Sequence, residues 1–197
     1  MLLKTHKVGG VATAILTTPY IHNYVDSELA YVFALGVTVV FAKIGAEIPD
    51  LDLGWEQIKK KNSLWRSTLN RLFWLLGCKH RSWQTHCYTI TLIPLLIPIL
   101  MLLQTGLTGV SSEALFWILC GLEQGILSHL ILDSFNPRGV HLIPNKIIRF
   151  VPKKIAIVTG STMERWVMVL CIGLCIYGAF DSFNLIKDSV LVLTSIL

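Results

Sequence analysis

The chain has 197 residues, of which 53% are hydrophobic and 15% are charged, and its mean hydropathy is +0.63. Ordinary soluble domains carry about 25% charged residues, so this composition excludes a disordered or fibrous protein and disfavours a free soluble globule. The length fits one or two domains, and the apolar excess indicates that lipid surrounds much of the chain. We therefore predict an integral membrane protein.

The first part of the chain contains one weak and one long apolar segment. Residues 8–24 are interrupted by two glycines and a proline, which predicts a weak helix whose depth in the membrane stays open. A secretory signal is the alternative, but no small-residue cleavage site follows, so we expect the segment to be retained. Residues 29–48 are long enough to cross about 30 Å of hydrocarbon, and Pro49 ends the regular helix. Residues 53–81 are basic and amphipathic and contain Trp55, Trp65, Phe73 and Trp74 among the charges, which is typical of a helix lying on a membrane surface.

Three more apolar segments follow. Residues 87–107 carry no charge and contain Pro94 and Pro98, which predicts a kinked span. Residues 113–132 and 166–180 are the next two predicted spans.

The remaining segments are a polar connection and a tail. Residues 133–165 are polar and basic with a turn by composition, and the apolar tail 190–197 could re-enter the bilayer or lie along it. We predict an all-α fold: a polytopic membrane helical bundle of about four or five hydrophobic helices with an interfacial helix on the cytoplasmic side. No linker or repeat divides the chain, so residues 1–197 are expected to form a single membrane-embedded domain.

The net charge of +5 is explained by membrane orientation. If the N-terminus is cytoplasmic, ten Lys and Arg residues up to Arg81 and six in residues 138–165 fall on the cytoplasmic side, and only Lys187 falls outside. The basic balance then gives no separate reason to expect a nucleic-acid partner. The five cysteines form no CxxC pair, which indicates small buried hydrophobic residues rather than a disulfide or zinc–thiolate framework.

The same topology brings seven potential metal ligands to one side of the membrane. They come from four segments at the cytoplasmic ends of helices: His6, Asp50, Asp52, His80, His86, His129 and Asp133. Mixed imidazole and carboxylate donors suit zinc first, with manganese or iron as alternatives.

Two of these motifs carry most of the signal. His129 and Asp133 are four residues apart, so they share one helix face and could share an ion. A His–Asp hydrogen bond inside a bundle explains the pair about as well, but ionisable groups in an apolar span are costly and usually functional. His80 and His86 bracket Arg81 just before a span, where the alternative is a juxtamembrane anchor.

The other motifs are weaker. Asp50 and Asp52 alternate after Pro49, so one could bind a metal while the other orients a histidine, and a solvated helix stop is the alternative. His6 alone gives no signal. Glu123 lies deeper, which favours a helix–helix hydrogen bond.

Taken in order, these motifs resemble the LexA-regulated, inner-membrane metal-dependent hydrolase family. The resemblance covers about residues 1–145 and is carried by Thr5-His6, Ile48-Pro49-Asp50-Leu51-Asp52, His80-Arg81, Thr85-His86, Ser128-His129, and Asp133 through Gly139 and Pro144. It implies a multi-pass protein of the bacterial inner membrane that hydrolyses its substrate.

That family is distantly similar to the zinc-dependent phospholipase C and single-strand nuclease group, which are all-helical enzymes with clustered zinc ions. An early His, an Asp, a further His and a His-x3-Asp pair supply the ligands there, and the residues that match them in order are His6, Asp50, His86 (or His80), and His129 with Asp133. The later His-x3-Glu pair has no counterpart, because no histidine follows His141. The resemblance therefore implies one or two metal ions rather than three.

We expect a metal-dependent hydrolase of the bacterial inner membrane, with a cytoplasmic N-terminus, that cleaves an ester and first of all a phosphoester. The expected metal ligands are His6, Asp50, His86, His129 and Asp133, with His80 and Asp52 as further ligands or supports. Arg81 is expected to hold a phosphate oxygen, so Arg81 and Asp52 are the expected catalytic residues. The expected partners are membrane lipid and a small-molecule or lipid phosphoester, with no nucleic acid.

Three other classes of protein compete with this hypothesis. A non-enzymatic membrane protein with a structural metal is the main alternative. A transporter is disfavoured because residues 92–103 and 167–179 carry no acid, base or histidine. An acyltransferase is disfavoured because four residues usually separate its His and Asp, whereas three separate His129 and Asp133.

Overall fold

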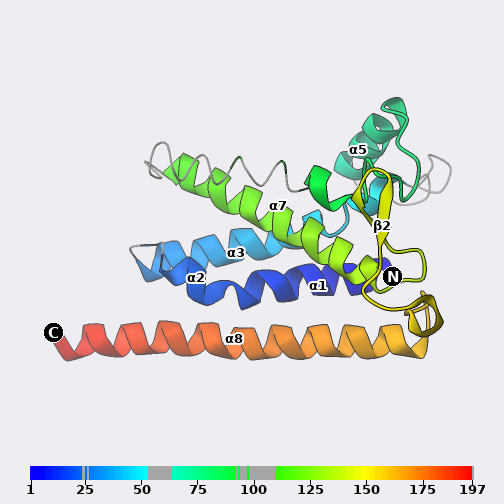
Figure 1. Cartoon of the computed structure of the whole chain (residues 1–197). Coiled ribbons are helices and arrows are strands. Elements are labelled where there is room, and N and C mark those ends of the chain that lie inside the picture. The colour runs from blue at the N-terminus through cyan, green and yellow to red at the C-terminus, as the bar shows by residue number, and fades with distance from the viewer. Residues whose placement is uncertain are drawn as a thin grey trace.

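Four long helices form the main body of the structure. The computed structural model describes residues 1–23, 25, 27–52, 64–91, 93, 97 and 110–196. The long helices are α1 (Leu3–Leu16), α3 (Glu28–Gly45), α7 (Val110–Ser134) and α8 (Thr162–Ile196). Helix α1 packs against the other three, α3 also packs against α7, and the four lie roughly side by side (Figure 1).

Three of the helices are long and apolar enough to cross a membrane. These candidate spans are Glu28–Asp52, Glu113–Ser134 and Thr162–Leu185, and they coincide with three of the predicted spans. The all-α membrane fold is thereby confirmed. Most of the predicted span over residues 87–107 lies outside the described residues, and the described part of it begins as helix at residues 88–91.

The N-terminal helix starts earlier than predicted. Helix α1 begins at Leu3, so His6 lies within it, and the short helix α2 (Thr18–His22) follows with Pro19 in its first turn. The prediction treated Gly9 and Gly10 as interruptions of a weak helix. They are instead positions of close helix packing, because a Cβ on Gly10 would lie only 2.7 Å from the Ala42 carbonyl oxygen.

The C-terminal segment is one continuous helix. The sequence did not decide whether the part after residue 180 re-enters the bilayer or lies along its surface. In the structure, α8 continues to Ile196 without a break. Residues 181–189 contain neither Gly nor Pro, so nothing in the backbone stops the helix.

The connections form a cap at one end of the bundle. The 3-10 helix η1 (Pro49–Asp52) follows α3, and α5 (Leu64–Leu75) is a helix within the predicted interfacial segment. Residues 53–63 of that segment lie outside the described residues. The N-terminus, η1, α5 and the ends of α3 and α7 gather at this end (Figure 1), and the buried cluster around Tyr31 and Trp117 lies toward the other end of α3 and α7.

The polar connection between α7 and α8 contains a β-hairpin that the all-α prediction did not include. Strand β1 (Val140–Ile143) pairs antiparallel with β2 (Lys146–Ile148), with Val140 opposite Ile148. The 3-10 helix η2 (Lys153–Ile155) follows before α8. Strands of three and four residues give too short an alternation to be separated from a turn by sequence pattern.

Candidate metal centre

The candidate ligands come from four elements that meet at the capped end of the bundle. His6 is on the second turn of α1, and His129 and Asp133 are on the last two turns of α7. Asp50 is on η1, which forms because Pro49 ends the regular helix after α3. His86 lies in the turns between α5 and the helix at residues 88–91.

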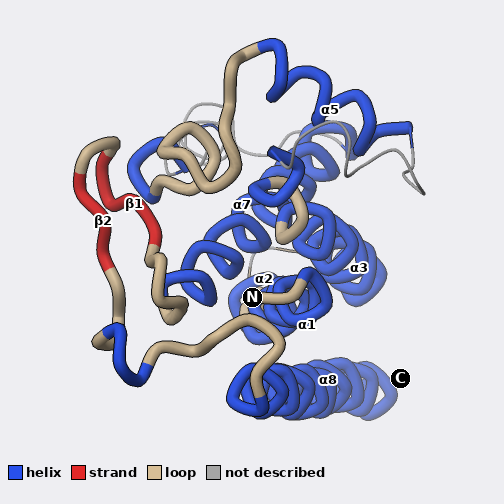
Figure 2. Tube along the Cα trace, turned by 90° about the vertical axis from the view of Figure 1, so that its right-hand side faces the viewer, coloured by secondary structure: helices blue, strands red, loops and turns tan. Residues whose placement is uncertain are grey.

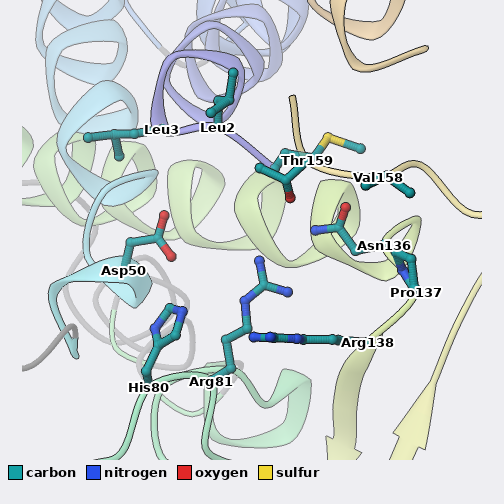
Figure 3. A pocket seen from close by; sticks show the side chains of 11 residues that line it. Leu2, Leu3, Asp50, His80, Arg81, Asn136, Pro137, Arg138, Val158 and Thr159 are labelled. Carbon is teal, nitrogen blue, oxygen red and sulfur yellow. The ribbon is translucent and has the colours of Figure 1, made fainter. Parts of the chain in front are cut away.

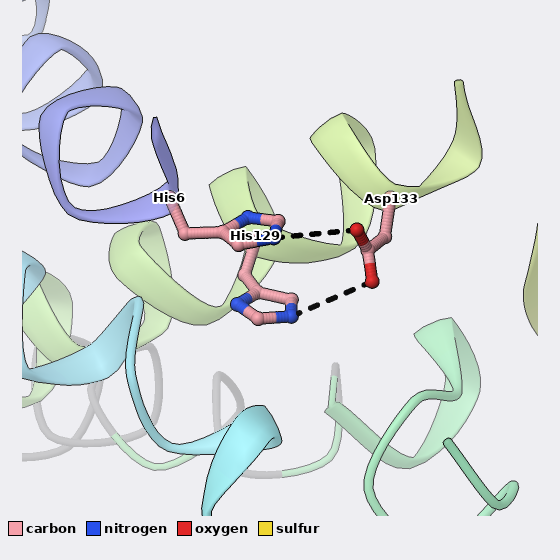
Figure 4. Close-up of side chains that lie close together, drawn as sticks. All are labelled: His6, His129 and Asp133. Carbon is pink, nitrogen blue, oxygen red and sulfur yellow. Dashed lines mark ion pairs between the residues drawn. The ribbon is translucent and has the colours of Figure 1, made fainter. Parts of the chain in front are cut away.

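His6, His129 and Asp133 form one compact group (Figure 4). The two imidazole rings are stacked, with centroids 3.7 Å apart and planes inclined by 12°. His6 Nε2 lies 3.3 Å from Asp133 Oδ1, and His129 Nε2 lies 3.7 Å from Asp133 Oδ2. All three side chains are completely buried.

A second group shares His129 with the first. Asp50 Oδ1 lies 3.7 Å from His129 Nε2 and 3.9 Å from His86 Nε2. His86 Nε2 is also 3.8 Å from Asp133 Oδ2, which connects the two groups. In each group one donor atom per residue lies within 4.8 Å of the others, a spacing compatible with a common ion bound at about 2.0–2.2 Å.

Hydrogen bonds fix which nitrogen of His129 and His86 faces the centre. His129 Nδ1 lies 2.8 Å from the Ala46 carbonyl oxygen, which can only accept, so this nitrogen carries the hydrogen and Nε2 keeps its lone pair. Thr85 Oγ1 donates to the Asp52 carboxylate and lies 3.1 Å from His86 Nδ1. His86 Nδ1–H can therefore donate a hydrogen bond to Thr85 Oγ1. The lone pair of His86 Nε2 then stays free to bind a metal at the centre.

The polar atoms that converge here make no hydrogen bonds with the part of the chain that the structure describes. They are the buried Nε2 atoms of three histidines, His6, His86 and His129. The buried Asp133 Oδ2 beside them has the Arg81 guanidinium as its charge partner. A buried polar atom left unpaired costs about 1–3 kcal/mol, and the great majority are paired in native proteins. Three such nitrogens beside the Asp50 and Asp133 carboxylates are the arrangement that a bound cation satisfies, so this donor set fits a divalent metal.

Asp52 lies behind the donors rather than among them. Its carboxylate accepts from the Arg81 backbone N–H (2.9 Å) and from Thr85, and it lies 2.7 Å from His80 Nδ1 and 3.5 Å from His86 Nδ1. The structure thus places His80 against Asp52 at the rim, with 35% of its side chain exposed, and outside both donor groups.

Arg81 connects the centre to an open pocket. Its Nη2 lies 2.8 Å from Asp133 Oδ2, and its backbone has φ = 58°, a left-handed conformation that turns the chain at this point. The pocket has a volume of about 510 Å³ and is lined by Asp50, His80, Arg81 and Arg138, among others (Figure 3). A small molecule can therefore reach Asp50, a donor of the second group, from outside.

Sequence reasoning missed several partners of the site. Asn136 Nδ2 donates to Asp133 Oδ1 at 2.6 Å, and the Met1 ammonium contacts the same oxygen at 2.7 Å. Arg138 also went unnoticed as a pocket residue. The only available signal for Asn136 and Arg138 was the Asn-Pro-Arg-Gly stretch after α7, which by composition indicates no more than a turn.

Comparison with known proteins gives one match. Neither the curated proteins nor the solved structures include a significant match to this chain. The family described as YdjM inner membrane protein matches residues 1–195, which is nearly the whole sequence. This match agrees with the three apolar helices and confirms the inner-membrane location. The chain belongs to the YdjM inner membrane protein family.

Proposed function

We propose that this protein is a metal-dependent hydrolase that cleaves an ester, first of all a phosphoester, at the cytoplasmic face of the inner membrane. The observation that carries the proposal is the convergence of the unpaired, buried Nε2 atoms of His6 on α1, His129 on α7 and His86 beside an open pocket. The bases at the same end of the bundle support a cytoplasmic position, because positive charge concentrates on cytoplasmic loops.

The two donor groups have room for one or two ions. His6, His129 and Asp133 would hold one, and Asp50 and His86 would complete a second around the shared His129. Nitrogen and oxygen donors of this kind suit zinc first. A divalent ion bound there would supply Lewis acidity and activate a water molecule near neutral pH.

The protein's own side chains have separable tasks. Arg81 faces the pocket with a planar guanidinium, which binds two phosphate oxygens at once and places the phosphorus next to the donor groups. Asp52 positions His86 through Thr85 and also holds His80. Burial of His6, His129 and Asp133 excludes water from the far side of the centre.

The alternative is a non-enzymatic membrane protein with a structural metal site. Structural zinc sites are closed, with protein ligands in every position, whereas catalytic sites keep a position open to substrate. The pocket reaches Asp50, a donor of the second group, from outside. This opening favours the enzyme over the structural site.

Metal analysis combined with a turnover assay tests the proposal. Detergent-purified protein is analysed for bound metal and then incubated with a chromogenic phosphodiester before chelation, after chelation and after zinc is restored. We expect turnover that chelation abolishes and zinc restores. The Arg81→Gln variant should keep its metal but lose at least tenfold in kcat/KM, because it removes a phosphate contact rather than a ligand.

The two contrary outcomes are distinct. Stoichiometric metal without turnover of any phosphoester would support the structural site. Protein that contains no metal as purified and binds none when zinc is added would overturn both hypotheses.

A further inference from the structure

The surface between α7 and α8 has a strongly one-sided charge. The sequence contains no acidic residue between Asp133 and Glu164. Residues 138–158, called the basic segment below, carry five exposed bases: Arg138, Lys146, Arg149, Lys153 and Lys154. None of the five forms an ion pair with a residue that the structure describes.

Large apolar side chains are exposed among these bases. They are Leu142, Ile143, Ile147, Phe150, Ile155 and Val158, with exposed fractions from 36% to 68%. They lie outside the candidate membrane spans, so lipid contact of a spanning helix does not account for them. A surface that faced water alone would mix both signs of charge and expose fewer large apolar groups.

The basic segment is held firmly in this exposed position. Phe150 N–H donates to the Ser134 carbonyl at 3.0 Å, and Ile157 N–H donates to the Phe135 carbonyl at 2.9 Å. Val140 of β1 is almost completely buried. The exposed isoleucines therefore belong to a folded element anchored on the end of α7.

The basic segment lies at the end of the bundle where the membrane surface must be. It is at the same end as the N-terminus and the end of α7 (Figure 1), and these parts of the chain carry His6, His129 and Asp133 of the metal centre. In the end-on view of Figure 2, the hairpin and the loop after it lie to one side of the ends of α1, α3, α7 and α8. Because α3, α7 and α8 contain the candidate spans, a bilayer around these helices would bring its headgroups to the level of the basic segment.

We propose that the basic segment binds the headgroups of anionic phospholipids, with Ile155 and its apolar neighbours in the interfacial layer. Bases paired with aliphatic and aromatic side chains are the composition of elements that lie in a membrane interface. The positive-inside rule accounts for the bases but not for the exposed isoleucines. An acidic protein would match the charge, but the spans already hold the segment beside a concentrated layer of headgroups.

This surface adjoins the pocket of the metal centre. Arg138 and Val158 belong to the basic segment and also line the pocket. One wall of the pocket would therefore lie in the headgroup layer. Lipid binding by the basic segment does not require hydrolysis, so it can be tested independently of the proposed enzyme activity.

Lipid selectivity is the first test. The full-length protein is reconstituted in bilayers of phosphatidylcholine and phosphatidylglycerol, and spin-labelled lipids report the relative association constant of each. Wild-type protein should prefer phosphatidylglycerol, and Lys153→Gln/Lys154→Gln should weaken that preference about fivefold per lost charge at this site. Lys187→Gln, toward the C-terminal end of α8, should leave it unchanged.

Depth measurement is the second test and needs no change of charge. A fluorophore on Ile155→Cys, corrected for labelling of the wild type, should be quenched by headgroup-level nitroxide lipid and shielded from aqueous iodide. A label that stays in water in bilayers both with and without phosphatidylglycerol would overturn the proposal. An acidic protein would then be left as the partner. Unchanged selectivity in Lys153→Gln/Lys154→Gln would also overturn it.

Discussion

His6 and His129 stack their imidazole rings at a centroid distance of 3.7 Å, with both Nε2 atoms directed toward the carboxylate of Asp133. One ring comes from the N-terminal helix and the other from the end of α7. Two buried imidazoles with unpaired Nε2 atoms gain little from stacking alone, since each leaves a lone pair or an N–H without a partner. A shared cation removes this cost, and several predictions depend on it.

Removing either of the two ligands on α7 should abolish metal retention. His129→Ala deletes the donor that both groups share, and Asp133→Ala deletes the carboxylate that faces the Nε2 atoms of both rings. We expect both variants to insert in the membrane and to lose at least tenfold in metal per protein, measured by elemental analysis after purification. His22→Ala, on α2 away from the centre, should keep the wild-type metal content. Full retention in both ligand variants would contradict the assignment.

Asp52 should act on metal affinity without being a ligand. Its carboxylate accepts from the Arg81 backbone, Thr85 and His80, so it fixes the loop that carries His86. Loss of such a supporting contact typically costs 10–100-fold in metal affinity. We therefore expect Asp52→Asn to weaken zinc binding about tenfold in competition with a chromogenic chelator, while saturating zinc restores full occupancy. An Asp52→Asn protein that stays empty at saturating zinc would make Asp52 a ligand instead.

The sequence predicts the membrane fold well because lipid imposes a simple rule on it. A span must be apolar over about 20 residues, so residues 29–48 and 113–132 are recognisable without any tertiary information, and residues 166–180 mark the apolar centre of the third span, Thr162–Leu185. The early start of α1 was not recognisable. Gly9 and Gly10 lower helix propensity in isolation, and only the neighbouring helices show that they serve packing.

The sequence predicts that the candidate site residues share one side of the membrane, but it does not predict which of their side chains are in contact. Topology places His6, His80, His86 and His129 on the same side. The stacking of His6 on His129 needs α1 close to α7, and this approach depends on Gly9, where a Cβ would lie 3.0 Å from Ser128 Oγ. The left-handed turn at Arg81 likewise separates His80 from His86. An arginine rarely adopts this backbone conformation, so the sequence does not predict the turn.

Close packing of α3 against α7 should be needed for both stability and the centre. A methyl group on Gly125 would collide with the Ala42 carbonyl and lie 2.6 Å from Ala46 N. We expect Gly125→Ala to cost about 1–3 kcal/mol of unfolding free energy. It should also weaken metal retention, because Ala46 supplies the carbonyl that orients His129.

The matched control for this packing is on the partner helix. Gly36 of α3 has nothing within 4 Å of where its Cβ would be. Gly36→Ala should be neutral or stabilising by up to about 1 kcal/mol, because alanine favours helix. Thermal unfolding in detergent and metal content measure both effects. Equal behaviour of the two variants would show that α3 and α7 are not in close contact.

Glu47 should hold the cap of the bundle in place. Its buried carboxylate pairs with Lys7 at 2.6 Å and with Arg66 of α5, and both cations are about one-quarter exposed. Removal of the charge breaks both ion pairs, and we expect Glu47→Gln to cost about 2 kcal/mol, between the values for exposed and buried pairs. Limited proteolysis within residues 64–75 should become faster. Glu28→Gln, whose partner His22 is about one-third exposed, should leave proteolysis there unchanged.

Metal binding should raise the stability of the folded protein in proportion to occupancy. A ligand present at 100 times its Kd stabilises the native state by about 2.7 kcal/mol, and the donors of this centre come from α1, η1 and α7, which meet only in the folded chain. Chelation should therefore lower the Tm of the wild type, and added zinc should restore it. His129→Ala should show the lower Tm with or without zinc, because it lacks the donor that both groups share. A zinc-dependent rise in Tm of the same size in this variant would place the stabilising ion elsewhere in the protein.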